Sequence, residues 1–273
     1  MTMESLHEAW LTMGRAFLAA ALLATVPAAL GVYVVLRRVV FVGIALAEFS
    51  AVGIALALSF ALPPGLLAPA FALGGVLLLS QAAGRSVLPR DSIVGLSYVT
   101  AGAAAILVLK HFGQASGEEL KALMWGSLIF ADASDVKLLA LALAVAGLPL
   151  ALFSRQLLFT GFDPEMAAAS GYRVRWWDLL FFGVLGLVAA AATRVAGVLV
   201  TFGFLVLPAA AALQLARSLR RAVILAVVFG LLSAALGSLL SLQLDSPTGP
   251  MIVACSFVLF ALASLVRLIA RIS

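Results

Sequence analysis

The chain has 273 residues, of which 64% are hydrophobic and only 11% are charged, and its mean hydropathy is +1.21. Soluble domains do not have this balance, and apolar runs of about 20 residues recur from end to end. The sequence therefore predicts an all-α, polytopic membrane helical bundle, with residues 1–273 forming a single transmembrane domain. The net charge of +5 falls in short loops, which suits the positive-inside rule and not a nucleic-acid partner. The one cysteine, Cys255, excludes an internal disulfide and a thiolate-rich metal site.

Nine apolar segments are predicted to cross the lipid bilayer. In chain order they are residues 16–36, 39–60, 64–83, 91–109, 136–153, 177–195, 198–216, 222–242 and 250–268. The seventh is the least regular, because Gly197 and Gly203 flank its start and Pro208 interrupts it. It is expected to be kinked or to re-enter without crossing, which would leave eight spans.

The basic residues predict how these spans are oriented. With the N-terminus outside and the C-terminus inside, 12 of the 17 basic residues fall on the cytoplasmic side and four on the outer side. The cytoplasmic set comprises Arg37, Arg38, Arg85, Arg90, Arg155, Arg173, Arg175, Arg217, Arg220, Arg221, Arg267 and Arg271. Short cytoplasmic loops carry an excess of Lys and Arg, so the sequence predicts an N-out, C-in topology.

Glu48 is the only charge in the 46 residues between Arg38 and Arg85, and it falls inside the second predicted span. A carboxylate at that depth costs about 2.5–3.5 kcal/mol on insertion scales, so it is expected to face protein or water. Two interpretations stay open: a protonated or hydrogen-bonded Glu48 that locks helix packing, or a Glu48 on a solute path. Ser97 in the fourth span is likewise either a core hydrogen-bonding group or a path-lining one.

Two polar segments between spans are long enough to carry structure of their own. In the inner one, Asp163 suits a helix N-cap, Pro164 the first helical position and Gly171 a C-terminal stop. These residues predict a short cytoplasmic helix, and its alanines (Ala167, Ala168 and Ala169) suit docking into the groove of a partner. In the outer segment, residues 118–130 predict an amphipathic helix at the membrane interface.

Several kinds of chemistry have no motif in this sequence. There is no G-x-x-x-x-G-K-[ST] phosphate loop, so the chain shows no nucleotide-binding loop of its own. Neither H-E-x-x-H nor G-x-S-x-G is present, which gives no support to an intramembrane protease or lipase. Both histidines, His7 and His111, are predicted outside, so neither joins Glu48 in a cluster within the membrane.

Four stretches resemble the membrane subunit of bacterial ABC-type zinc, manganese and iron uptake systems. They are VYVVLRRVVFVGIALAEFSAVGIALAL (32–58), RDSIVGLSYV (90–99), GFDPEMAAASGY (161–172) and VAGVLVTFGFLVLPAAAALQLA (195–216), the last followed by D-S-P-T-G-P at 245–250. Each is moderately specific, and their order along nearly the whole chain strengthens the resemblance.

The resemblance implies a homodimeric permease in the bacterial cytoplasmic (inner) membrane. It implies two separate ATP-binding subunits below the permease and an extracytoplasmic solute-binding protein above it. The ATPase activity is then expected on the partner, with ATP bound there and no cofactor bound by this chain. Residues 163–171 would be the coupling helix that docks on the ATPase, with Asp163, Pro164, Glu165, Ala167, Ala168 and Gly171 as its key positions.

One position departs from the family pattern. The family commonly has Asp and His in a G-D-A-L-S-H motif in the second span, where this chain has Ile44 and Glu48. An i, i+4 pair shares one helix face, so Glu48 is the one ligand-capable group left on that face and the predicted metal contact. Replacing Asp and imidazole by one carboxylate weakens the case for zinc relative to harder ions.

The leading hypothesis is the permease subunit of an ATP-driven importer for a divalent metal ion: zinc, manganese or iron. The candidate path residues are Glu48, Ile44 and Ser97. Two alternatives stay open: an ABC permease for a metal chelate or other small solute, and a stand-alone secondary transporter with Glu48 as ion carrier.

Overall fold

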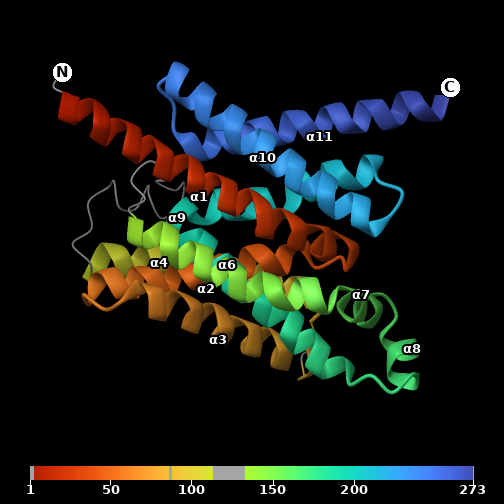
Figure 1. The fold of residues 1–273 in the computed structure, drawn as a ribbon. Helices are drawn as coiled ribbons and strands as arrows, with labels where there is room; N and C mark the ends of the chain where they lie inside the picture. Colours follow the sequence, from red (N-terminus) through yellow and green to blue (C-terminus); the bar gives the residue numbers. More distant parts are fainter. Residues whose placement is uncertain (1–2, 86–87, 113–132, 273) are drawn as a thin grey trace. The chain divides into compact units, whose positions relative to one another are not determined.

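The computed structural model describes residues 3–85, 88–112 and 133–272, and these residues form ten α-helices (Figure 1). The helices are α1 (Met3–Leu36), α2 (Val40–Ser59), α3 (Pro64–Arg85), α4 (Arg90–Phe112), α6 (Ala133–Leu152), α7 (Ser154–Phe162), α8 (Pro164–Ala169), α9 (Val174–Leu215), α10 (Leu219–Gln243) and α11 (Thr248–Ile272). The prediction of an all-α fold is therefore confirmed for the described residues. The amphipathic helix predicted at 118–130 lies outside the described residues.

All nine predicted spans fall on helices, but the count of nine is not supported. Among the described residues, six helices are long and apolar enough to cross a membrane, or seven if α6 and α7 together make one bent span. The predicted third span is a shorter apolar helix, Pro64–Ser80. The predicted sixth and seventh spans are parts of one element, the 42-residue α9.

The break within α9 comes at Gly197 and not at Pro208. Gly197 has φ 75° and ψ 170°, a conformation that side-chain-bearing residues rarely adopt, whereas the helix continues through Pro208. The helix therefore changes direction one residue before the predicted start of the seventh span. The expectation of a kink in this region is confirmed, but the residue that makes it is the glycine.

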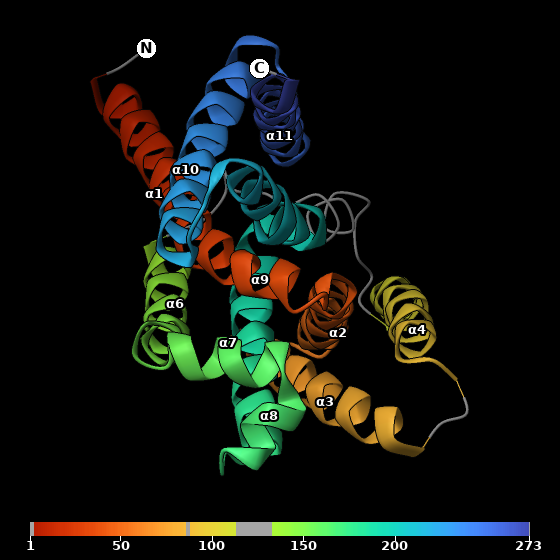
Figure 2. The ribbon, with the colours of Figure 1, turned by 90° about the vertical axis from the view of Figure 1, so that its right-hand side faces the viewer.

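A second sharp change of direction separates α6 from α7. The two helices meet at Phe153 and are bent by 71° relative to each other. α7 and α8 are joined only by Asp163, which ends one helix and caps the next. Figure 2 shows this short pair of helices between the end of α6 and the start of α9.

The described chain divides into two compact units. The first contains the described parts of Met1–Val32, Lys121–Leu141 and Val195–Ser273, and the second contains those of Tyr33–Leu120 and Ala142–Arg194. In the first unit, α1 and α10 approach closely, since a Cβ on Gly230 would lie 2.6 Å from the carbonyl oxygen of Ala24. In the same unit α9 packs on α11, where a Cβ on Gly203 would lie 2.8 Å from Val253 Cγ2.

In the second unit, α2 packs against both α3 and α4. α2 and α4 run parallel, because the C-terminal end of each lies beside that of the other. The Ser59 hydroxyl donates to the Val108 carbonyl at 3.5 Å, and the rings of Phe60 and Phe112 are 6.0 Å apart. This parallel arrangement places the middle of α2, where Glu48 lies, beside the middle of α4.

The first part of α9 extends from one end of the second unit to the other. Asp178 near its start lies at the α1–α2 joint, 2.9 Å from Arg37. At the opposite end, a Cβ on Gly65 at the start of α3 would lie 2.9 Å from Arg194 Nη1. The residues between Asp178 and Arg194 cover about 24 Å at a helical rise of 1.5 Å per residue, which approaches the thickness of a bilayer core.

Candidate functional site

Glu48 is buried in the second unit, where α2 meets α4. The residue is 3% exposed, and its carboxyl group lies against Gly102 of α4. A Cβ on Gly102 would sit 3.2 Å from Glu48 Oε2 and 3.5 Å from Oε1, so glycine leaves the room that the carboxyl group occupies. Glu48 Oε2 has no hydrogen-bond partner among the described residues. A buried acceptor of this kind is costly unless something binds to it.

Ile44 lies four residues before Glu48, and Ser97 lies five residues before Gly102, both toward the N-terminal ends of the two helices. Ile44 is half-buried and precedes Glu48 by about 6 Å of helical rise. Ser97 is half-buried, in line with the buried Val94 and Ala101 of α4. Since α2 and α4 are parallel, the predicted path residues fall on one stretch of the same helix pair.

The side-chain atoms at Glu48 and Ser97 that could bind an ion are oxygens. The described residues contain no group of three or more His, Cys, Asp or Glu side chains that could hold a metal ion together. Glu48 brings one carboxylate, Ser97 of α4 is a hydroxyl five residues before Gly102, and no imidazole or thiolate is present at Ile44 and Glu48, the two positions of the family motif. Oxygen donors suit hard divalent cations and are a poor match to zinc, which prefers nitrogen and sulfur.

The predicted inner helix is present as α8. The Asp163 side chain accepts a hydrogen bond from the Met166 backbone N–H at 2.9 Å, and Pro164 occupies the first turn. Gly171, which follows the helix, has φ 87°, a conformation that favours glycine. The predicted cap, first residue and stop signal are all confirmed.

One of the three alanines predicted to form a docking face on α8 is not exposed. Ala167 is fully buried, whereas Glu165, Met166, Ala168 and Ala169 are exposed. A six-residue helix must pack one side on the protein, and the smallest side chain allows the closest approach. Ala167 therefore faces the chain itself, and Met166 with its neighbours forms the exposed side.

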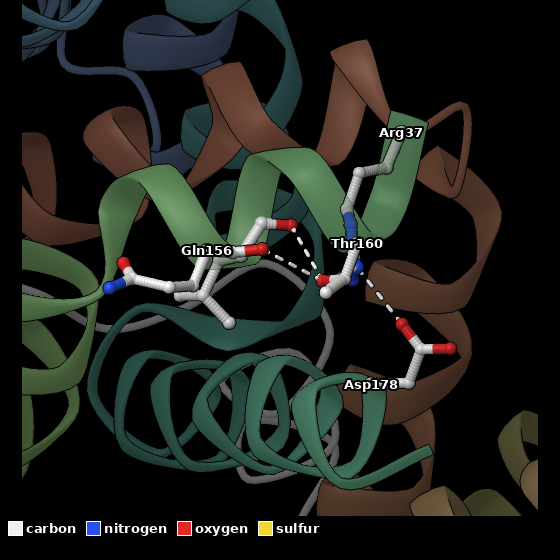
Figure 3. Close-up of polar contacts among 5 residues, drawn as sticks. Arg37, Gln156, Thr160 and Asp178 are labelled. Atoms are coloured by element: carbon white, nitrogen blue, oxygen red, sulfur yellow. Dashed lines mark hydrogen bonds and ion pairs between the residues drawn. The ribbon is translucent and has the colours of Figure 1, made fainter. Parts of the chain in front are cut away.

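The structure also shows a cluster that the sequence patterns did not identify, centred on Arg37 in the α1–α2 joint (Figure 3). The side chain of Arg37 is 3% exposed and donates to Asp178 Oδ1 of α9 at 2.9 Å. The same Nη2 donates to the Thr160 hydroxyl of α7 at 3.4 Å. The guanidinium carbon lies 4.2 Å from the ring centroid of Phe181, a cation–π contact. Burial lowers the pKa of Arg37, and the charge of Asp178 and its hydrogen bond oppose that shift.

One signal in the sequence pointed to this cluster. Asp178 is the only acidic residue between Glu165 and Asp245, and it stands at the start of an apolar helix. An acidic side chain in that position is expected to pair with a basic one, because an unpaired buried charge is costly. The positive-inside count treated Arg37 only as one of many cytoplasmic charges, and the helix that brings Asp178 to it could not be read from spacing.

The described residues combine several apolar helices long enough to cross a membrane with a buried carboxyl group at Glu48, features typical of a polytopic membrane transport protein. Residues 10–267 match the ABC 3 transport family. The chain belongs to this family and is a membrane permease subunit of an ABC transporter.

Named relatives cover most of the chain. The manganese transport system membrane protein MntC of Halalkalibacterium halodurans is 28% identical over 257 residues, covering 91% of this chain and 85% of the relative. The high-affinity zinc uptake system membrane protein ZnuB of Haemophilus influenzae is 25% identical over 251 residues, covering 91% of this chain and 95% of the relative. Among solved structures, PsaBC from Streptococcus pneumoniae in complex with Fab matches with a TM-score of 0.83 and 25% identity, covering 92% of this chain and 90% of that one.

Proposed function

We propose that this chain is the permease subunit of an ATP-driven importer for a divalent metal ion, with Glu48 on the path of the ion. The observation that carries the proposal is the Glu48 carboxyl group. It is 3% exposed inside an apolar helix, beside Gly102, and its Oε2 lacks a hydrogen-bond partner among the described residues. Ionisable groups kept in such positions mark ion pathways more often than they serve packing.

The substrate we propose is a hard divalent ion of the manganese type. The donors on α2 and α4 are oxygens, and the carboxylate takes the place of the imidazole in the family pattern. Relatives named for manganese and for zinc are both present, so family membership alone does not choose between these ions. The ligand chemistry favours manganese, because carboxylate, hydroxyl and carbonyl oxygens suit it better than zinc.

We place the α1–α2 joint and the segment from α7 to the start of α9 on the cytoplasmic side of the bacterial inner membrane. Arg37 contacts both Thr160 and Asp178, so these segments share one end of the second unit. That shared end carries Arg38, Arg155, Arg173 and Arg175 as well, in keeping with the positive-inside rule. An N-out, C-in chain follows if α3 crosses, the bent α6–α7 pair counts once and α9 crosses twice, on either side of Gly197.

The partners in this proposal are those of an ABC importer. ATP binds to a separate subunit that contacts the exposed side of α8, and a solute-binding protein delivers the ion from outside. Two copies of this chain form the permease. Movement of α8 on ATP binding and hydrolysis would then open the path alternately to either side, with Glu48 holding the ion between steps.

Reconstitution of the complete complex in liposomes tests the proposal. The complex contains this chain, its ATPase and its binding protein, and the readouts are uptake and ATPase rate with manganese, iron and zinc in turn. We expect manganese to be accumulated and to accelerate ATP hydrolysis, and zinc to do so less. A flat response to all three ions, while a chelated metal is taken up, would replace the free ion by a chelate as substrate. Uptake by this chain alone would instead indicate a secondary transporter.

A further inference from the structure

The segment from Phe153 to Trp177, which contains α7 and α8, is held together by its own aromatic rings. Phe159 of α7 makes an edge-on contact with Tyr172 beyond α8, with ring centroids 5.7 Å apart. Tyr172 in turn contacts Trp177 at 6.4 Å, and Trp177 contacts Phe153 at 5.4 Å. The ring contacts connect the residue before α7 to the start of α9. A force on the exposed side of α8 is therefore carried to α7, to which α8 is joined by a single residue.

Arg37 connects this segment to the helix that carries Glu48. Only residues 37–39 separate α1 from α2, and their backbone N–H groups all bond back to α1, to the carbonyls of Tyr33, Val35 and Val34. The joint is short, and these three hydrogen bonds restrict its backbone. A displacement of the Arg37 side chain is passed to the first turn of α2, and Glu48 lies about 12 Å further along that helix.

The donor and acceptor roles in the hydrogen bonds of Arg37 are defined by its partners. The Thr160 hydroxyl donates its single proton within α7, to the carbonyls of Gln156 at 2.9 Å and Leu157 at 3.3 Å (Figure 3). Its lone pairs are therefore free to accept from Arg37 Nη2. The second proton of that nitrogen goes to Asp178 of α9. One guanidinium nitrogen thus ties the α1–α2 joint to α7 and to α9 together.

The guanidinium of Arg37 is closely packed on at least two sides. A Cβ on Gly161, the neighbour of Thr160, would collide with Nε of Arg37. Phe181 covers one face of the guanidinium at 4.2 Å. Gly161 and Phe181 restrict movement of the Arg37 side chain, and both protons of Nη2 are used in hydrogen bonds. Arg37 is therefore expected to act as a rigid connection between the elements that it touches.

We infer that Arg37, held by Asp178 and Thr160, is the positioning residue that transmits movement of the α7–α8 segment to α2. It thereby couples ATP hydrolysis on the partner to the state of the Glu48 site. The inference rests on the proposed function, because it assumes that α8 meets the ATPase and that Glu48 binds the ion. Arg37 itself touches neither the ion nor the ATPase in this account.

The test measures coupling in the complete reconstituted complex, as ions transported per ATP hydrolysed and as stimulation of ATPase by manganese. The variants are Arg37→Ala and Asp178→Asn, each judged against its own complex yield and basal ATPase rate. We expect both coupling readouts to fall at least about fivefold, the lower end of typical coupling between sites, with basal ATPase retained. Arg37→Lys should fall in between, because it keeps the charge but loses the planar fork.

Arg38→Ala is the matched control. Arg38 occupies the same joint and carries the same charge, but it is exposed. It should couple as the wild type does. The double variant Arg37→Ala/Asp178→Ala should be no worse than Arg37→Ala alone, because the two residues act through one contact.

Unchanged coupling in assembled Arg37→Ala and Asp178→Asn complexes would overturn the inference and leave the pair a purely structural role. Equal loss in Arg38→Ala would also overturn it, since the charge of the joint would then matter and not the contact. If Arg37→Ala does not assemble, Arg37→Lys and Asp178→Asn carry the same test. A wild-type complex that hydrolyses ATP without responding to any metal ion would refute the proposed function instead, and that result is visible before any variant is made.

Discussion

Two buried charges in the same unit, Glu48 on α2 and Arg37 at the α1–α2 joint, have opposite surroundings. Both side chains are about 3% exposed. Nη2 of Arg37 has a carboxylate and a hydroxyl as partners and Phe181 covers the guanidinium, although Arg37 Nε has no hydrogen-bond partner among the described residues. Glu48 Oε2 has no hydrogen-bond partner among the described residues either, and the carboxyl group rests against a glycine. Burial alone therefore does not identify a transport residue. Arg37 connects three elements through its contacts, whereas an ion-binding role for Glu48 is the proposal that the following predictions test.

The largest expected effect comes from removing Glu48, whose Oε2 has no hydrogen-bond partner in the described part of the chain. Glu48→Ala should lower metal uptake by at least about 100-fold, since even the outer partners of metal ligands are worth 10–100-fold. Complex assembly should be unaffected, because no hydrogen bond to Oε2 is lost. Uptake of radiolabelled manganese into proteoliposomes checks this.

Ser50→Ala is the control for that variant. Ser50 is fully buried on the same helix, and its hydroxyl also has no hydrogen-bond partner among the described residues. If Ser50→Ala reduces uptake as strongly as Glu48→Ala, both residues act through packing of α2. The contrast between Glu48 and Arg37 would then lose its meaning.

A smaller effect, on the stability of the complex, is expected from crowding Arg37. Gly161→Ala introduces a Cβ that collides with Arg37, and overpacking of this kind costs about 1–3 kcal/mol. The thermal midpoint of the purified complex in detergent should fall. Gly183→Ala on α9 is the matched control, because nothing lies within 4 Å of a Cβ there. A midpoint unchanged in Gly161→Ala would show that Arg37 has more freedom than the contacts indicate.

The smallest effect is expected at the cap of α8, which lies beyond the Arg37 contact. Asp163→Ala removes the hydrogen bond to the Met166 N–H, and the loss of such a cap costs about 1 kcal/mol. Hydrogen exchange of the α8 amides should speed up, while that of α2 stays the same. Ser218→Ala, at the longer 3.5 Å cap of α10, should have less effect on its own helix. Faster exchange throughout α2 in Asp163→Ala would show that α8 and α2 are coupled more directly than through Arg37.

Much of the fold was predictable because its signals are local. The apolar runs predicted the long helices of the described residues, and Asp163, Pro164 and Gly171 predicted the bounds of α8 to within a residue, but α7 (Ser154–Phe162) was not predicted. The position of Glu48 within an apolar helix followed from the sequence as well. Its role on the ion path, and that of Ile44 and Ser97, stays a prediction.

The errors concern what depends on packing. The sequence predicted an irregular segment from Gly197, Gly203 and Pro208 together and did not choose among them, whereas α9 continues through Pro208 and breaks at Gly197, where the predicted sixth and seventh spans divide. The sequence also counted Ala167 as part of a docking face, whereas α8 turns that residue inward. Pro208 is tolerated inside α9 because neighbouring helices can satisfy the freed backbone group. The burial of Ala167 depends on which side of α8 packs on the chain, and composition does not give that.

By itself, the sequence determined the class of this protein and its long helical segments, because hydropathy and capping act over a few residues, and its four motifs carried the resemblance to the family. Only the tertiary structure decided which charges meet. Arg37 and Asp178 are 141 positions apart, and their pairing depends on how α1, α7 and α9 pack in the second unit. Burying a charge without a partner is costly, and the partner of Arg37 is supplied by packing between helices, which no local pattern in the chain encodes.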